Sequence, residues 1–269
     1  MEKTNRQARR IALTRLLVDN PNRLFSLGYF STLFSTAKST LSEDIETIRQ
    51  SLAEYGLGRV ETVAGAAGGV RYVPLRPAEA IRGLLAELAE KLAAPDRIIP
   101  GGFLYMSDLL FSPRLTTGVG EIFLTRFAAA APDRIMTVET KGIPLAFATA
   151  RAFNLPLVTV RRGSRVTEGT AVSINYVTGS SRRIQTMSLP KRAVPAGARV
   201  LIIDDFMKAG GTARGLVDLA QEVGATVAGV GVLVATARPA DKLVDNFLSL
   251  LILHEVDEHN KKTDIRPVW

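Results

Sequence analysis

The sequence lacks cysteine altogether and contains only two histidines, His254 and His259. Without cysteine the chain can form no disulfide and no thiolate metal site, and two histidines leave little for a zinc site or for imidazole catalysis. No run of 18 apolar residues is present, and the residues after Met1 are charged, unlike a signal peptide. We therefore expect a cytoplasmic protein that neither crosses a membrane nor holds a metal through its own side chains.

Positive charge is in excess. The 269 residues are 46% hydrophobic, enough for two moderate domains, and their formal net charge of +8 fits a polyanionic partner. Residues 1–76 hold 11 Lys and Arg against 7 Asp and Glu, which makes the amino end relatively basic. Residues 161–192 hold seven cations against Glu168 alone and are rich in Ser, Thr and Gly, a composition that predicts a mobile basic loop.

The first third of the chain has the pattern of a small helical module. Residues 5–18 carry a helical stripe of Ile, Leu and Val, and residues 27–34 form a second short helix. A third helix is predicted after a capping box that begins at Ser39 or Thr40, and Gly56 ends it.

A predicted hairpin completes this module. The β-prone residues 59–63 and 70–73 flank a glycine-rich tip. Three helices and a hairpin are typical of a winged helix-turn-helix, whose third helix enters the major groove while cations and helix N-termini meet phosphates. The alternative is a helical oligomerisation module with solvated cations. The predicted DNA contacts are Lys38, Ser39, Thr40 and Ser42 on the third helix, Arg6, Arg9 and Arg10 on the first, and Arg71 at the wing.

The rest of the chain alternates β-prone and helical segments. An amphipathic helix after residue 77 leads into short apolar runs at residues 135–138, 157–160, 200–203 and 227–234. This alternation predicts an α/β fold, with a parallel sheet covered by helices on both faces.

One strand of that sheet ends in "VLIIDDFMKAGGTARG". Asp204 and Asp205 follow its apolar residues, and a glycine turn with Thr212 precedes a helix predicted to begin near Ala213. Amides at a helix start bind phosphate, and a carboxylate can accept hydrogen bonds from sugar hydroxyls. The pattern therefore predicts a ribose 5-phosphate site, with an acidic strand-end turn that binds nothing as the alternative.

Two stretches resemble type I phosphoribosyltransferases, which bind 5-phosphoribosyl-1-pyrophosphate (PRPP). "VLIIDDFMKAGGT" resembles their 13-residue signature, "ETKGIPLAFA" is similar to the pyrophosphate loop of orotate-type members, and the basic segment lies where those enzymes carry a flexible hood. The resemblance implies PRPP contacts at Asp204, Asp205, Phe206, Met207, Lys208, Ala209, Gly210, Gly211, Thr212, Thr140, Lys141 and Gly142, and hood residues at Arg161, Tyr176, Arg182 and Arg183.

Almost the whole chain resembles the purine operon repressors of Gram-positive bacteria, notably in "STAKST", "GAAGGVRY", "RIIPGG" and "RIQTMSL". The resemblance implies a winged-helix domain at residues 1–74 and a phosphoribosyltransferase-like domain at residues 75–269. It also implies a homodimer that represses purine biosynthesis genes on operator DNA, is released by PRPP and is not a catalyst.

Lys208 bears on whether this domain catalyses. Several purine-using relatives place an Asp at this position, and an ionised lysine cannot accept a proton from a base. We therefore expect no catalytic residue, although a pyrimidine transferase with an accessory helical domain remains the alternative. No cofactor is required, Mg²⁺ would accompany the diphosphate of PRPP, and guanosine tetraphosphate is a candidate competitor for the site.

Overall fold

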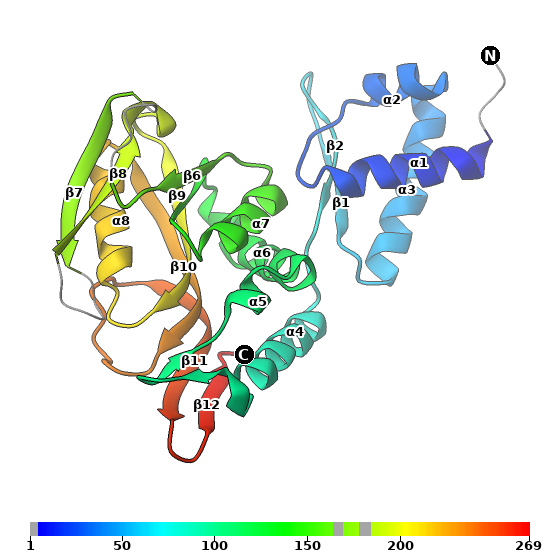
Figure 1. Ribbon diagram of the computed structural model, residues 1–269. Helices are drawn as coiled ribbons and strands as arrows, with labels where there is room; N and C mark the ends of the chain where they lie inside the picture. The colour runs from blue at the N-terminus through cyan, green and yellow to red at the C-terminus, as the bar shows by residue number, and fades with distance from the viewer. Residues whose placement is uncertain (1–4, 164–168, 178–183) are drawn as a thin grey trace. The chain divides into compact units, whose positions relative to one another are not determined.

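The computed structural model describes residues 5–163, 169–177 and 184–269. The chain divides into two compact units, the first made of residues 1–77 with 151–154 and the second of residues 78–150 with 155–269 (Figure 1). Within the described parts of the chain, no helix has the length and apolarity needed to cross a membrane.

Three helices open the N-terminal unit, and local caps fix two of their starts. The Asn5 side chain accepts a hydrogen bond from the backbone N–H of Gln7 at 2.8 Å, and Ser26 accepts one from the backbone N–H of Tyr29 at 3.1 Å. These bonds satisfy N–H groups that have no partner within the helix. The helices are α1 (Arg6–Asp19), α2 (Leu27–Phe34) and α3 (Lys38–Glu54).

The start of α3 differs from the prediction. The helix begins at Lys38, its N-cap is Ala37, and no side chain caps it. Ser42 lies within the first turns and donates its hydroxyl to the carbonyl of Lys38 at 3.0 Å. A serine or threonine three residues before an acid also fits inside a helix, which is why the capping-box spacing misplaced the start.

A two-stranded antiparallel hairpin follows, β1 (Arg59–Val63) and β2 (Gly69–Val73). The backbone of Phe25 pairs with Val70 beside it. A Cβ at Gly69 would lie 2.2 Å from the carbonyl oxygen of Phe25, so only glycine fits this approach. The predicted order of three helices and a hairpin is confirmed, and the elements enclose an apolar core formed by Leu13, Leu17, Phe25, Phe30, Leu41, Ile45, Ile48, Leu52, Val60, Val70 and Tyr72.

The second unit contains a six-stranded sheet in the order β12-β11-β10-β9-β5-β6. Neighbouring strands are parallel except β12, which runs antiparallel to β11. The predicted α/β fold is thus confirmed as a mostly parallel sheet. Its strands are β5 (Arg134–Val138), β6 (Leu157–Val160), β9 (Arg199–Met207), β10 (Thr226–Thr236), β11 (Phe247–Asp257) and β12 (Lys262–Pro267).

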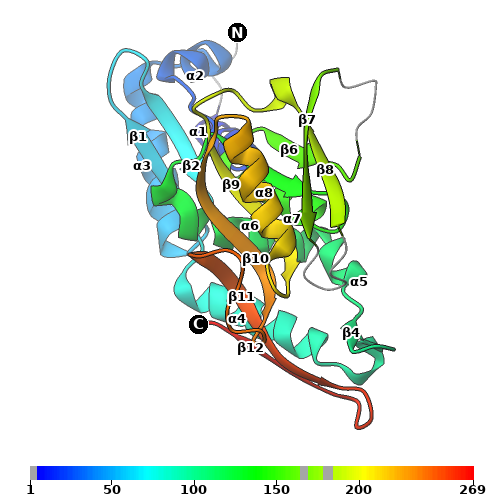
Figure 2. The same ribbon diagram turned by 90° about the vertical axis from the view of Figure 1, so that its left-hand side faces the viewer.

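Helices cover both faces of this sheet (Figures 1 and 2). Along β9, Val200 and Ile202 pack with α8, whereas Leu201 and Ile203 point to the opposite face, which Phe123 of α6 covers. The helices of this unit are α4 (Ala78–Leu92), α5 (Ser107–Leu110), α6 (Pro113–Phe127), α7 (Ile143–Phe153) and α8 (Gly211–Glu222).

The basic segment predicted as a mobile loop forms an antiparallel hairpin in its described residues, β7 (Ala171–Val177) and β8 (Ile184–Pro190). The hairpin packs on α8 at Gly215, where an added Cβ would lie 2.9 Å from Met187 and 3.0 Å from Tyr176. Alternating apolar residues on β7 bury one face of the hairpin, and this burial holds it against the helix.

Candidate ligand pocket and nucleic-acid interface

The ligand pocket lies where the sheet reverses its order of strands. From β5 the chain crosses to β6 on one side, whereas β9 lies on the other side of β5. Ligands of open α/β sheets bind at such a reversal, outside the carboxyl ends of the strands. The turn after β5 and the acid pair on β9 therefore meet in one place.

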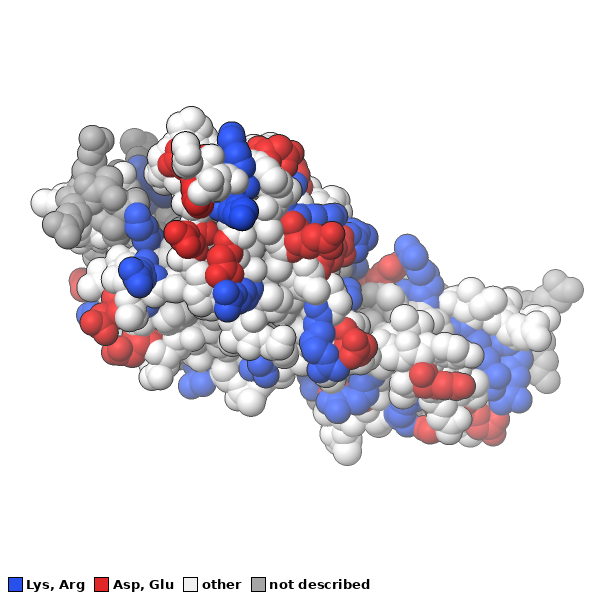
Figure 3. Space-filling model, turned by 90° about the horizontal axis from the view of Figure 1, so that it is seen from below, with Lys and Arg blue, Asp and Glu red and all other residues white. Residues whose placement is uncertain are grey.

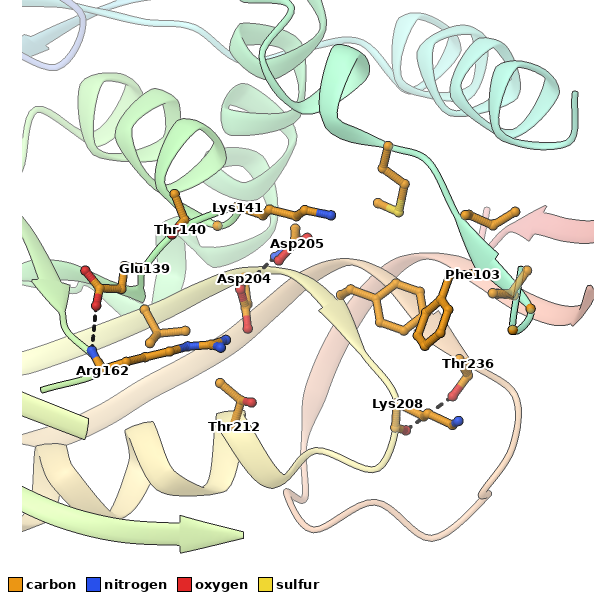
Figure 4. A pocket seen from close by; sticks show the side chains of 18 residues that line it. Phe103, Glu139, Thr140, Lys141, Arg162, Asp204, Asp205, Lys208, Thr212 and Thr236 are labelled. Carbon is orange, nitrogen blue, oxygen red and sulfur yellow. Dashed lines mark hydrogen bonds between the residues drawn. The ribbon is translucent and has the colours of Figure 1, made fainter. Parts of the chain in front are cut away.

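A cavity of about 660 Å³ occupies this position, and a second one of about 400 Å³ adjoins it and shares six of its lining residues (Figure 4). All twelve residues predicted from the two motifs line them. In the larger cavity are Thr140, Lys141, Gly142, Asp204, Asp205, Phe206, Lys208 and Thr212, and the smaller adds Met207, Ala209, Gly210 and Gly211. The structure thus brings the two motifs together.

The acid pair lies inside β9, not beyond its end as predicted, because the strand continues to Met207. The neighbouring strand β5 pairs with β9 only as far as Ile202, so the following residues of β9 border the cavity on that side. Burial, and then the charge of Asp205, raise the pKa of Asp204 well above its usual value. Burial also raises the pKa of Asp205.

The glycine turn after β9 forms the start of α8. Gly210 is the N-cap and has a left-handed backbone with φ of 85°, which glycine adopts without strain. The helix begins at Gly211, two residues earlier than predicted. As in any helix, the backbone N–H groups of its first turn have no partner within the helix. Thr212 adds a hydroxyl at the wall of both cavities.

The turn after β5 supplies the opposite wall. Thr140, Lys141 and Gly142 precede α7, and the peptide between Glu139 and Thr140 is cis. A Cβ at Gly142 would lie 2.5 Å from Thr137 Oγ1 and 2.7 Å from Asp204 Oδ1. Only glycine therefore allows this turn to approach the acid pair.

Arg162 is a pocket residue that the sequence reasoning missed. Its side chain lines both cavities and points between Asp204 and Thr212 (Figure 4). Its backbone N–H donates to Glu139 Oε1 at 2.7 Å, which holds the end of β6 beside the end of β5. The sequence could have predicted this position, because Arg162 closely follows a predicted parallel strand, and the residues after such a strand lie at the ligand-binding edge of the sheet.

The other end of the larger cavity is apolar, with Phe103 opposite Arg162 (Figure 4). Leu104, Met106 and Leu253 also line it. The pocket therefore combines one end lined by charged side chains with another at which apolar side chains gather.

The predicted hood residues lie in different environments. Arg161 pairs with Ser188 through its backbone and approaches Glu139 at 3.7 Å, beside the pocket. Tyr176 is buried, donates its hydroxyl to Gln185 at 2.9 Å and packs on α8, so its predicted role over the ligand does not fit its position. Arg182 and Arg183 lie outside the described residues.

In the N-terminal unit, a groove of about 520 Å³ runs between the start of α3 and the hairpin. Lys38 and Ser42 line it, as do Arg49 and Thr62 and the glycine-rich tip. Ser39 is exposed on the same turn of α3, and Thr40 is half-buried. The first turn of α3 and the wing together form the candidate DNA surface.

Of the three arginines of α1, Arg9 is the one that differs from the prediction. Arg9 is buried and donates to Asp44 Oδ2 at 2.7 Å, and Arg10 and Arg6 donate to Asp44 Oδ1 at 2.8 and 3.2 Å. The burial of Arg9 is at odds with its predicted role as a phosphate contact. Arg6 remains half exposed, and its prediction stays open.

Arg71 lies within β2 and not at the hairpin tip. Its guanidinium donates twice to Glu61 Oε2, at 2.8 and 3.0 Å. Burial raises the pKa of Glu61, but hydrogen bonds from Arg71 and Arg59 outweigh it and hold the pKa below its usual value. Arg71 and Arg59 therefore share one carboxylate, which leaves a net positive charge on this part of the hairpin.

Net charge alone does not locate the DNA surface. Figure 3 shows one face of the molecule, on which Lys and Arg side chains are interspersed with Asp and Glu. Mixed charge of this kind gives no single attractive field.

The first unit has the three helices and hairpin of a winged helix-turn-helix, and the second has an α/β sheet with phosphoribosyltransferase-like motifs at its pocket. This combination is that of a transcriptional regulator with a ligand-binding domain, and comparisons with known proteins agree. Residues 5–74 match the family "Bacterial purine repressor, N-terminal", and residues 107–263 match "Phosphoribosyl transferase domain".

The chain is 48% identical to the purine biosynthesis transcriptional repressor PurR of Bacillus subtilis, over 98% of this chain and 93% of that protein. It is 37% identical to the purine biosynthesis transcriptional activator PurR of Lactococcus lactis, over 97% of this chain and 96% of that protein. The chain therefore belongs to the family of bacterial purine repressors, as its motifs predict.

The second unit also has the fold of a solved enzyme. Adenine phosphoribosyltransferase from Giardia lamblia, complexed with 9-deazaadenine, is similar with a TM-score of 0.56 over 64% of this chain and 98% of that chain. The sequence identity is 19%, so the likeness concerns the fold alone.

Proposed function

We propose that the chain is a DNA-binding repressor of purine biosynthesis genes in which the phosphoribosyltransferase fold senses PRPP without catalysis. Similarity along the whole chain to purine biosynthesis regulators supports the first part. The observation that carries the second part is the pocket in which the acid pair, the turn at the start of α8 and three cations, Lys141, Arg162 and Lys208, converge.

The polar end of the pocket suits a ribose 5-phosphate. Asp204 and Asp205 offer carboxyls to the ribose hydroxyls, and burial raises the pKa of both groups. The phosphate would bind the amides from Gly210 to Thr212, where the positive end of the α8 dipole also favours an anion.

The diphosphate of PRPP would bind at the opposite wall. Lys141 provides a cation there, and the backbone of Thr140 and Gly142 lies beside it. Arg162, which points between Asp204 and Thr212, adds a second cation from the side. In the described part of the chain no three His, Asp or Glu residues gather into a metal site. Mg²⁺ would accordingly be held by phosphate oxygens and water, and its charge would offset that of the diphosphate.

Lys208 supports sensing over purine transfer. It lines both cavities, where an ionised amine attracts phosphate and cannot take a proton from a purine. The relatives that match nearly the whole chain are named as regulators, whereas the xanthine and adenine phosphoribosyltransferases cover 56% and 64% of it.

For PRPP to release DNA, it must bind the DNA-free state more tightly than the DNA-bound state. We propose a homodimer as the binding species, since paired winged helices match two half-sites of a palindromic operator. The Bacillus subtilis relative is named a repressor and the more distant Lactococcus lactis relative an activator, and we favour repression because the identity to the first is higher.

A mobility-shift titration tests the proposal. DNA from the control region of a purine biosynthesis gene should bind the protein, and PRPP with Mg²⁺ should release it. Guanosine tetraphosphate should compete with PRPP in calorimetry. Pyrophosphate release that depends on an added nucleobase would instead support a transferase with an accessory helical domain. DNA binding that PRPP leaves unchanged would overturn the sensor role.

A further inference from the structure

The segment between β10 and β11 lies against the glycine turn that begins α8. The backbone N–H of Leu243 donates to the carbonyl of Ala209 at 2.9 Å. A Cβ at Gly210 would lie 3.3 Å from the backbone nitrogen of Leu243, so the two segments are in close contact. The turn whose backbone N–H groups are the candidate phosphate ligands is therefore in direct contact with the loop that contains Leu243.

One lysine joins these two segments. Lys242 Nζ donates to the carbonyl of Lys208 at 2.5 Å, to the carbonyl of Thr236 at 2.7 Å and to Thr236 Oγ1 at 3.3 Å. An ammonium group has three donors, and here all three have protein acceptors. Lys242 is half-buried, and this burial lowers the pKa of its amine.

The carbonyl of Lys208 depends on this ammonium. Thr236 Oγ1 lies 3.2 Å from that carbonyl and 2.7 Å from the carbonyl of Arg238, but a hydroxyl has one proton to donate. The shorter bond, to Arg238, takes the proton, and Lys242 in turn donates to the hydroxyl oxygen. Lys242 is thus the stronger donor to the carbonyl of Lys208.

A direct role in ligand binding does not fit this geometry. Lys242 lines neither cavity, whereas Lys208 and Thr236, which it contacts, line the larger one. The lysine contacts Lys208 through its backbone carbonyl and not through its side chain. Its charge therefore acts on the shape of the turn.

We propose that Lys242 is a positioning residue that holds the turn from Lys208 to Gly210 in its anion-binding form. The inference rests on the proposed PRPP site for its functional consequence, but the effect on the turn itself does not. Loss of the ammonium leaves the carbonyl of Lys208 without its main donor, and the turn gains freedom that a ligand must then remove.

The test compares Lys242→Met, which keeps the length of the side chain, and Lys242→Arg, which keeps its charge. Lys262→Met is the control and removes the same charge, because Lys262 is exposed, lines neither cavity and lies outside the basic segment of residues 161–192. Each full-length protein is measured for PRPP affinity by calorimetry, for binding of purine-gene control DNA, and for hydrogen exchange of the amides at residues 207–213.

We expect Lys242→Met to weaken PRPP binding on the order of tenfold, a size typical of a lost charged hydrogen bond, and to speed exchange at residues 207–213. DNA binding without PRPP should stay unchanged, Lys242→Arg should recover most of the affinity, and Lys262→Met should match the parent protein.

Weaker PRPP binding with unchanged exchange would overturn the inference, because it would make Lys242 a direct ligand. Unchanged exchange together with unchanged affinity would overturn it as well. A parent protein that binds no PRPP would sink the proposed sensor function, and exchange at residues 207–213 would then decide the role of Lys242 by itself.

Discussion

Arg9 on α1 and Asp44 on α3 form a buried ion pair, in which Arg9 Nε donates to Asp44 Oδ2 at 2.7 Å and the two residues are 5% and 0% exposed. Arg10 and Arg6 donate to the other oxygen of the same carboxylate. One acid therefore fastens the first helix to the candidate recognition helix.

Removal of this acid should destabilise the N-terminal unit. We expect Asp44→Ala to lower the free energy of unfolding by about 3 to 5 kcal/mol, because it leaves the guanidinium of Arg9 buried without its counter-charge. Glu43→Ala is the control, since Glu43 is a mostly exposed partner of Arg6 and should cost less than about 1 kcal/mol. Urea unfolding measures both, and equal effects would contradict the role of burial.

The same pair gives a pH dependence. Burial raises the pKa of Asp44, but hydrogen bonds from Arg10, Arg9 and Arg6 outweigh it and hold the pKa below the ordinary value of 3.8. The unfolded chain therefore takes up the proton first as the pH falls. The stability from Asp44 is complete above about pH 4 and is lost below it, as the pH falls through the folded pKa. Urea midpoints from pH 6 to 3 should show a steeper acid loss for the parent protein than for Asp44→Ala.

The sequence contains a sign of this pair, although not the pair itself. Arg9 precedes Leu13 and Leu17 by four and eight residues, and Asp44 lies beside Ile45 on the apolar stripe of α3. Charges on two apolar stripes indicate burial with a partner. Which charges meet depends on how the helices pack, and that is set by contacts distant in the sequence.

In the ligand pocket, too, the sequence predicts some residues and misses others. The motif residues from Asp204 to Thr212 could be predicted because they are contiguous and carry their own turn and helix start. Arg162 reaches the pocket only through the order of the strands. Tyr176 was predicted to lie in a mobile basic loop because the segment is rich in positive charge. The alternating residues Val172, Ile174 and Tyr176, which bury one side of β7, were the pattern that indicated a strand.

Gly142 offers a test of the close approach between the two walls of the pocket. We expect Gly142→Ala to abolish measurable PRPP binding, because the added methyl group would collide with Thr137 Oγ1 and Asp204 Oδ1. Gly83→Ala is the matched control, since its Cβ meets nothing within 4 Å inside α4 and alanine favours a helix. Calorimetry measures both, and full affinity in Gly142→Ala would refute the approach.

Arg162 should contribute to PRPP binding through its guanidinium. We expect Arg162→Ala to raise the dissociation constant for PRPP about tenfold, because a charge-assisted contact to the diphosphate is lost. Arg134→Ala serves as the control, because Arg134 begins β5 at the opposite end of the strand from the pocket. A loss of the same size in both variants would point to net charge as the cause.

Arg49 joins the candidate recognition helix to the wing, and its loss should affect one side of the DNA contact. Its Nε donates to the carbonyl of Val60 at 3.0 Å, its Nη2 donates to Thr62 Oγ1 at 2.6 Å, and Glu46 pairs with Nη1. We expect Arg49→Ala to weaken binding to purine-gene control DNA about tenfold, since the wing then loses its fixed angle to α3.

Hydroxyl-radical footprinting distinguishes this loss from general unfolding. Protection by the wing should disappear while protection by the first turn of α3 remains, because the contacts of α3 with the helical core do not involve Arg49. Gln50→Ala is the control, since Gln50 is exposed on the same helix and bonds only to Glu46 among its described side-chain partners. Uniform loss of protection along the site would instead mean that Arg49 contacts the phosphates itself or that the unit has unfolded, and circular dichroism separates those two outcomes.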